Sequence, residues 1–96
     1  MQRLGMRTLR WEAEARRQYR DSLTYIAAQN PVAAENLATE IERKLELLVQ
    51  FPEIGRKGRV VRTRELVVHP NYIVIYAARK HTIDLIRFVH ARQRYP

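Results

Sequence analysis

The stretch that decides the fold is RELVVHPNYIVIYAA, residues 64–78. Its two halves, 64–69 and 72–78, are rich in β-branched and aromatic side chains. Between them, His69-Pro70-Asn71-Tyr72 places a proline at the favoured second position of a turn. The pattern predicts two antiparallel strands. Because segment 72–78 carries no charge, we expect it to be the central strand, partly covered on both faces.

The fold follows by working outward from this hairpin. A further strand is predicted from Ile83 to Val89 or His90, after a polar turn at 79–82. Upstream, Asn30-Pro31 caps a helix that runs to Phe51-Pro52. Residues 12–29 form another amphipathic helix, and 6–11 alternate like a short strand. The second helix carries a continuous apolar stripe expected to lie in the core: Ala34, Leu37, Ala38, Ile41, Leu45 and Leu48.

The predicted order is β-α-α-β-β-β, an α+β fold in which a helical hairpin packs on a small, mostly antiparallel sheet. We expect the first strand to join the same sheet. Ninety-six residues suit one domain, 1–96, and no linker or repeat divides the sequence. Met1 and Met6 are alternative starts, so residues 1–5 are expected to be dispensable.

Composition excludes several classes of protein. The chain has no cysteine, so a disulfide framework and thiolate chemistry are ruled out. The three histidines lie far apart in the sequence without metal-site spacing, and no phosphate-binding loop motif occurs, so neither a metal nor a cofactor is expected. No apolar run spans a bilayer, and arginines interrupt any leader-like stretch, which predicts a soluble cytoplasmic protein without membrane contact.

The net charge of +8 is concentrated in one half of the chain. Residues 1–50 hold eight basic and seven acidic side chains, whereas residues 51–96 hold ten basic and three acidic ones. A surplus of this kind favours acidic partners such as nucleic acid, a ribonucleoprotein or an acidic protein.

The strongest local signal is a basic segment around a predicted loop at 55–59 and the strand that follows. Its cations are Arg56, Lys57, Arg59, Arg62 and Arg64. Alternation predicts Arg62 and Arg64 on one face of their strand, with Leu66 and Val68 farther along. Arg87 shares its parity with apolar residues of the last strand, so it either faces a wet, concave site or pairs at the sheet edge with Glu65 or Asp84.

Directly after the last strand, His90, Arg92, Arg94 and Tyr95 supply groups suited to metal-free RNA cleavage. Histidine or tyrosine would transfer protons, and arginines would stabilise charge on the phosphorus centre. A solvated basic tail that binds an acidic protein has the same composition, so both interpretations stay open.

Several short motifs together resemble one family over nearly the whole chain. They are Trp11, Tyr25-Ile26-Ala27, Asn30-Pro31, Ala33-Ala34, Phe51-Pro52, Gly55-Arg56, Arg59-Val60, 63–68, 72–76 and His90-Ala91-Arg92-Gln93 closing on Tyr95-Pro96. This pattern is similar to the RelE/ParE superfamily of type II toxin–antitoxin toxins. Its closest resemblance is to the ParE branch.

The resemblance implies a growth-inhibiting toxin of an addiction module, neutralised by a cognate antitoxin. ParE-like members poison DNA gyrase and have no known nuclease chemistry, so no catalytic residue is expected. The alternative is a RelE-like, ribosome-dependent mRNA endoribonuclease that would use Arg64, Arg87, His90 and Tyr95. A third possibility, of another class, is a small basic nucleic-acid-binding module.

The charge pattern suits an acidic, partly disordered antitoxin that folds on binding, and operator DNA would be reached through that antitoxin alone. The surface expected to bind the target or the antitoxin comprises Arg56, Arg59, Arg62, Arg64, Arg87, His90, Arg92 and Tyr95.

Overall fold

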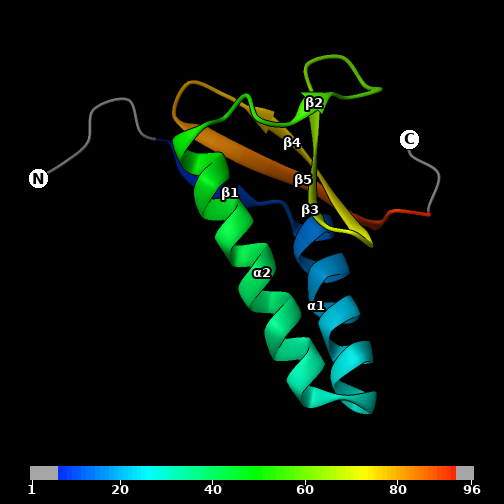
Figure 1. The fold of residues 1–96 in the computed structure, drawn as a ribbon. Coiled ribbons are helices and arrows are strands. Elements are labelled where there is room, and N and C mark those ends of the chain that lie inside the picture. Colours follow the sequence, from blue (N-terminus) through cyan, green and yellow to red (C-terminus); the bar gives the residue numbers. More distant parts are fainter. Residues whose placement is uncertain (1–6, 93–96) are drawn as a thin grey trace, which may run out of the picture.

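Two antiparallel helices lie against one face of a five-stranded sheet and project well beyond it (Figure 1). The computed structural model of the chain describes residues 7–92. The elements in order are β1 (Thr8–Trp11), α1 (Ala13–Gln29), α2 (Pro31–Gln50), β2 (Arg56–Lys57), β3 (Arg64–His69), β4 (Tyr72–Ala78) and β5 (Thr82–His90). None of the helices in this part of the chain is long and apolar enough to cross a membrane.

The strands run in the order β1-β5-β4-β3-β2, so β4 is central, as predicted. Strands β2 to β5 pair antiparallel, and β1 joins the same sheet by pairing in parallel with β5. The predicted α+β fold class is therefore confirmed, including the helical hairpin on a mostly antiparallel sheet.

The helical hairpin forms where the capping signals predict it. The Asn30 side chain accepts a hydrogen bond from the Ala33 backbone N–H at 3.1 Å, and Pro31 is the first residue of α2. The core between hairpin and sheet includes these buried residues: Ala15, Leu37, Ile41, Leu45, Leu48, Leu66, Val68, Val74, Tyr76, Ile83, Leu85 and Phe88.

A β-bulge in β5 reverses the side-chain alternation expected for this strand. Tyr76 pairs with Leu85 and the adjacent Ile75 pairs with Arg87, which leaves Ile86 as the extra residue. Leu85 and Phe88 therefore both face the helices. Arg87 shares the opposite face with Ile75, so it does not interrupt an apolar row as the sequence predicted.

Two further local predictions are wrong. Arg56 and Lys57 form the short strand β2 rather than part of a loop, because they pair with Glu65 and Arg64. Arg62 lies before β3 in a left-handed conformation, with a φ of 66°, so it does not share a strand face with Arg64.

Candidate functional site

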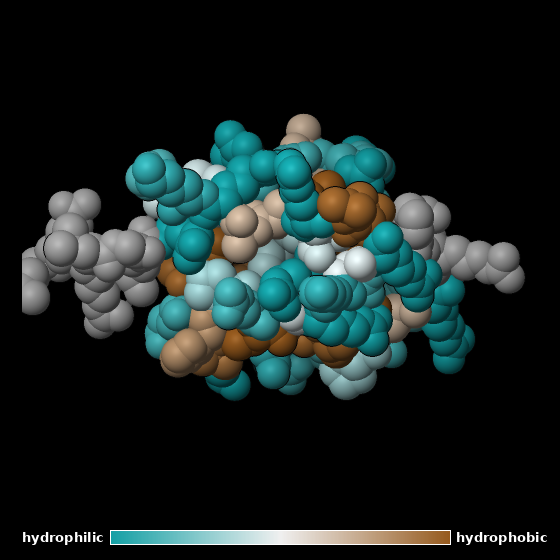
Figure 2. Space-filling view, turned by 90° about the horizontal axis from the view of Figure 1, so that it is seen from above, coloured by the Kyte–Doolittle hydropathy of each residue, from teal (hydrophilic) through white to brown (hydrophobic). Residues whose placement is uncertain are grey.

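The sheet face opposite the helices, which we call the open face, carries two buried carboxylates among arginines. Two rows of directly paired residues define it: Arg10, Asp84 and Ala77 in one, and Arg56, Glu65, Ile75 and Arg87 in the other. No helix of the described chain covers this face (Figure 1). Seen from above, the surface has hydrophilic side chains around a paler centre, with apolar patches beside the centre and along one margin (Figure 2).

Asp84 is fully buried and is held by two arginines from other elements. Arg10 donates from Nε to Oδ1 at 3.0 Å and from Nη2 to Oδ2 at 2.9 Å, and Arg79 Nε donates to Oδ2 at 2.5 Å. Burial alone would raise the pKa of Asp84, but the hydrogen bonds from Arg79, Arg10 and Thr82 lower it below its ordinary value. The carboxylate therefore stays ionised and holds two guanidinium groups against the end of the open face.

Glu65, the second buried carboxylate, is paired with the first cation of the basic segment. Arg56 donates to its Oε1 from Nη2 at 2.9 Å and from Nε at 3.2 Å, while the Arg59 backbone N–H approaches Oε2 at 3.4 Å. Glu65 thereby ties β2 and the following loop to β3. Part of the charge of the basic segment is compensated within the protein.

Arg64 braces the connection between α2 and β2. Its Nη1 donates to the Gly55 carbonyl at 2.7 Å and to the Glu53 carbonyl at 3.4 Å. Nearby, the buried Tyr76 hydroxyl donates to the Pro52 carbonyl at 2.7 Å and accepts from the Gly55 N–H at 3.0 Å. Arg64 thus supports the backbone, which limits what it can offer a partner.

The C-terminal candidate residues lie at the end of the sheet opposite to Arg64, because His90 pairs with Tyr72 and Arg64 pairs with Tyr76. The His90 ring packs edge-on against Tyr72, with ring centroids 5.3 Å apart, and Tyr72 stacks on Phe88. His90 Nδ1 accepts from the backbone N–H of exposed Arg92 at 3.2 Å. Tyr95 and Arg94 lie outside the described residues.

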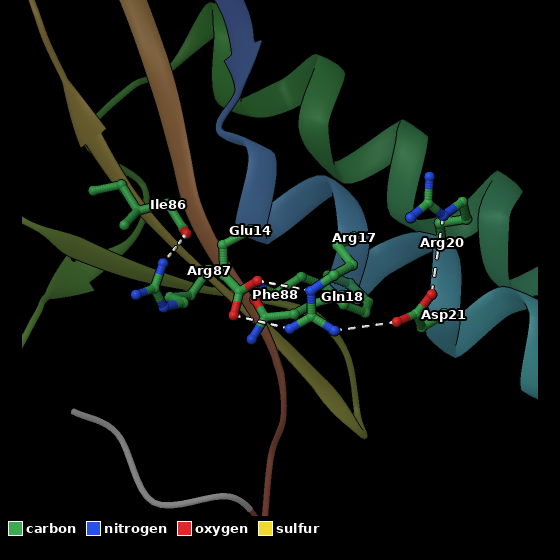
Figure 3. A network of polar contacts seen from close by, with 8 residues as sticks. All are labelled: Glu14, Arg17, Gln18, Arg20, Asp21, Ile86, Arg87 and Phe88. Carbon is green, nitrogen blue, oxygen red and sulfur yellow. Dashed lines mark hydrogen bonds and ion pairs between the residues drawn. The ribbon is translucent and has the colours of Figure 1, made fainter.

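Arg87 lies where the first turns of α1 meet β5 (Figure 3). Its Nη1 donates to the Ile86 carbonyl at 3.0 Å, and the Phe88 N–H donates to Gln18 Oε1 at 2.9 Å. The pKa of Glu14 on α1 is lowered chiefly by its hydrogen bond from Arg17, with a smaller contribution from the charge of Arg87. The partners considered for Arg87 from sequence are bound to other arginines: Glu65 to Arg56, and Asp84 to Arg10 and Arg79.

The groups proposed for RNA cleavage do not converge within the described part of the chain. Arg64 pairs with Tyr76 and His90 pairs with Tyr72, so the two positions are separated by four residues of β4, or about 13 Å. Arg87 lies on the other face of the sheet from both. Residues 7–92 also contain no group of three or more metal-binding side chains.

A groove that the sequence does not predict lies between α2 and β3. It has a volume of about 480 Å³ and is lined by Glu40, Arg43, Lys44, Leu47, Val67, Val68, His69 and Pro70. Leu47 and Val67 are exposed although apolar. Because β2 pairs only with Arg64 and Glu65, the rest of this β3 edge has no strand partner among the described residues. The one sequence feature that points to this groove is Leu47, an apolar residue of α2 that lies outside its buried stripe.

The family model and the relatives that match this chain all describe toxins. Residues 9–95 match the model for the ParE toxin of the type II toxin–antitoxin system parDE. The chain is 30% identical to toxin Y4kP of Sinorhizobium fredii over 94 residues, covering 97% of each protein. It is 33% identical to toxin RelE2 of Caulobacter vibrioides over 67 residues, covering 70% of this chain and 75% of that one.

Two solved structures share the fold. A chain from the chromosomal ParDE toxin–antitoxin system of P. aeruginosa superimposes with a TM-score of 0.79 at 18% identity, covering 90% of this chain and 97% of that one. The conserved hypothetical protein HP0894 of Helicobacter pylori gives a TM-score of 0.59 at 21% identity, covering 94% and 100%. The match to the family model and the relative that is similar over 97% of both chains show that this chain belongs to the ParE toxin family of type II toxin–antitoxin systems.

Proposed function

We propose that this toxin arrests growth by inhibiting DNA gyrase and is held inactive by an acidic antitoxin. The observation that carries the choice of gyrase is the match to the ParE toxin model across residues 9–95. The wide separation of Arg64 from His90 supports it, because general acid–base catalysis requires its groups within hydrogen-bond reach of one substrate. Gyrase inhibition by binding needs no such convergence.

Ribosome-dependent mRNA cleavage is the second candidate, favoured by the 33% identity to toxin RelE2. In that mechanism His90 or Tyr95 would transfer protons, and Arg64 and Arg87 would stabilise the transition state. The ribosome would have to bring distant groups together around the message. A small nucleic-acid-binding module is a weaker candidate, since a toxin family accounts for the whole chain.

The antitoxin is proposed to occupy the groove between α2 and β3. The groove offers apolar contacts from Leu47 and Val67, a strand edge without a strand partner among residues 7–92, and the cations Arg43 and Lys44 in its lining. An acidic amphipathic segment that folds on binding fits all three properties, through apolar burial, strand addition and charge pairing. We expect operator DNA to be bound through the antitoxin, and the complex to act in the cytoplasm.

The target is tested with purified protein and no antitoxin. Inhibition of gyrase supercoiling at a stoichiometric ratio, with ribosome-bound message left intact, is the expected result. Cleavage of that message, lost in His90→Ala, would overturn the gyrase proposal in favour of the nuclease.

The antitoxin groove is tested with Leu47→Glu, which places an anion among the groove's apolar contacts. Antitoxin binding measured by calorimetry should weaken by about tenfold or more. Val32→Glu is the matched control, because Val32 is also an exposed apolar residue of α2 but lies in its first turn, outside the groove. Equal antitoxin affinity of Leu47→Glu and the wild type would exclude the groove.

A further inference from the structure

The loop between β2 and β3, residues 58–63, presents two adjacent valines to solvent. Val61 is 82% exposed, the largest value for any large apolar side chain in the described chain, and Val60 is also exposed. A single exposed valine is ordinary on a protein surface, so exposure alone does not identify an interface. This loop differs from an ordinary exposed surface in its fixed conformation and in the charges around it.

The loop is fixed by its own hydrogen bonds. The Gly58 N–H donates to the Thr63 carbonyl at 2.8 Å, which closes the base of the loop. The Val60 carbonyl accepts from the Thr63 hydroxyl at 2.6 Å and from the Thr63 N–H at 3.2 Å. The two valines are therefore held in position before any partner arrives, and little conformational entropy remains to be lost on binding.

The backbone adopts unfavourable geometry to keep this shape. Arg62 has a φ of 66°, a left-handed conformation that residues with a Cβ rarely adopt. At Gly58 a Cβ would lie 2.3 Å from Thr63 Oγ1, so the base of the loop has no room for a side chain. A shorter turn could join β2 to β3 without this strain, and strained backbone of this kind persists where the surrounding structure enforces it, often at functional sites.

Cations frame the two valines. A hollow of about 420 Å³ lies along the loop, and Lys57, Arg59, Arg62 and Arg64 line it together with Val60 and Val61. No acidic residue of the described chain lines this hollow. Two exposed valines held in a fixed loop and surrounded by cations are complementary to an apolar pocket with carboxylates at its rim.

We propose that this loop is the anchor by which the toxin binds its target protein, with Val60 and Val61 entering an apolar pocket on an acidic surface of that protein. The proposal rests on the proposed function insofar as the target is a protein. Nucleic acid is a poorer fit, because valine offers bases no aromatic stacking surface and a phosphate backbone no charge. The loop is also separate from the residues that line the antitoxin groove.

Val61→Asp and Val61→Ile test the anchor. The exposed position makes either variant compatible with folding, which circular dichroism would verify. Induced without antitoxin, Val61→Asp should lose growth arrest, whereas Val61→Ile should retain it. With purified gyrase, Val61→Asp should bind at least about tenfold more weakly, as expected for a central interface residue. Its affinity for the antitoxin should stay within about twofold of the wild type.

Val32→Asp is the control, because Val32 is 64% exposed in the first turn of α2, next to the connection between the two helices. It should leave growth arrest unchanged. Full growth arrest by Val61→Asp would overturn the anchor, as would loss of antitoxin binding with gyrase binding intact. Failure of the wild type to bind gyrase would count against gyrase alone, since growth arrest that depends on Val61 would still support the anchor.

Discussion

Replacing Asp84 by Asn should destabilise the fold by about 2–3 kcal/mol, because the buried carboxylate accepts three charge-assisted hydrogen bonds from Arg10 and Arg79. Each such bond contributes about 1.5–3 kcal/mol when both groups are desolvated. The sum must be reduced here, since the Arg10 and Arg79 side chains are 62% and 60% exposed and regain water once released. The amide oxygen of Asn also retains one bond.

The loss in free energy of unfolding should be measured by urea unfolding monitored by circular dichroism, with linear extrapolation to water. In a domain of this size, 2–3 kcal/mol corresponds to a fall in Tm of about 10–20 °C. The matched control is Asp21→Asn, since Asp21 pairs with Arg17 on the surface and its side chain is 58% exposed. We expect that control to change stability by less than about 0.5 kcal/mol.

The pH dependence provides a second check. The pKa of Asp84 is lower in the folded protein than in the unfolded chain, so its stabilisation is fully present above the unfolded value of about 4 and is lost as pH falls through the folded value. The difference between wild type and Asp84→Asn should therefore be constant from pH 7 to about 5 and shrink below about pH 4. A difference in unfolding free energy below about 0.5 kcal/mol at pH 7 would refute the reasoning. It would mean that the cost of desolvating Asp84 cancels the gain from its hydrogen bonds with Arg10 and Arg79.

Substitutions at three further positions test separate features. Tyr76→Phe leaves the buried Gly55 N–H unsatisfied and should cost about 1–3 kcal/mol in urea unfolding; no loss would mean that water replaces the hydroxyl. Asn30→Ala removes the α2 cap and should cost about 1 kcal/mol, whereas Asn30→Asp should restore most of it. Gly58→Ala should lower the thermal midpoint through about 1–3 kcal/mol of overpacking, and an unchanged midpoint would show that Thr63 moves freely.

The overall fold was predictable because its signals are local. Asn30-Pro31 marks the start of α2 by itself, and the period of the apolar residues distinguishes the helices from β3 and β4. Strand β2 could not be predicted, because its residues Arg56 and Lys57 are both polar and a strand of two residues is too short to show alternation. The bulge at Ile86 was missed because an extra residue in one strand is apparent only once its partner strand is in register.

The site was less predictable, since it depends on contacts between distant segments. Arg10 and Asp84 are 74 residues apart in the sequence and meet only because β1 pairs with β5. From sequence alone, Asp84 is therefore a possible partner for Arg87, and neither Arg10 nor Arg79 stands out as its partner. Basic residues could be identified from composition, but which are compensated within the protein, such as Arg56 by Glu65, required the sheet order.

The parallel pairing of β1 with β5 has a consequence for synthesis of the toxin. Thr8, among the first described residues, pairs with Thr82, so β1 cannot join the sheet until the segment that forms β5 has been synthesised. A nascent or prematurely terminated chain that ends before Asp84 lacks most of β5 and the carboxylate that holds Arg10. Strand β5, which pairs with both β1 and β4, therefore has to be in place before the sheet is complete, and an antitoxin that recognises the complete sheet can bind only after that point.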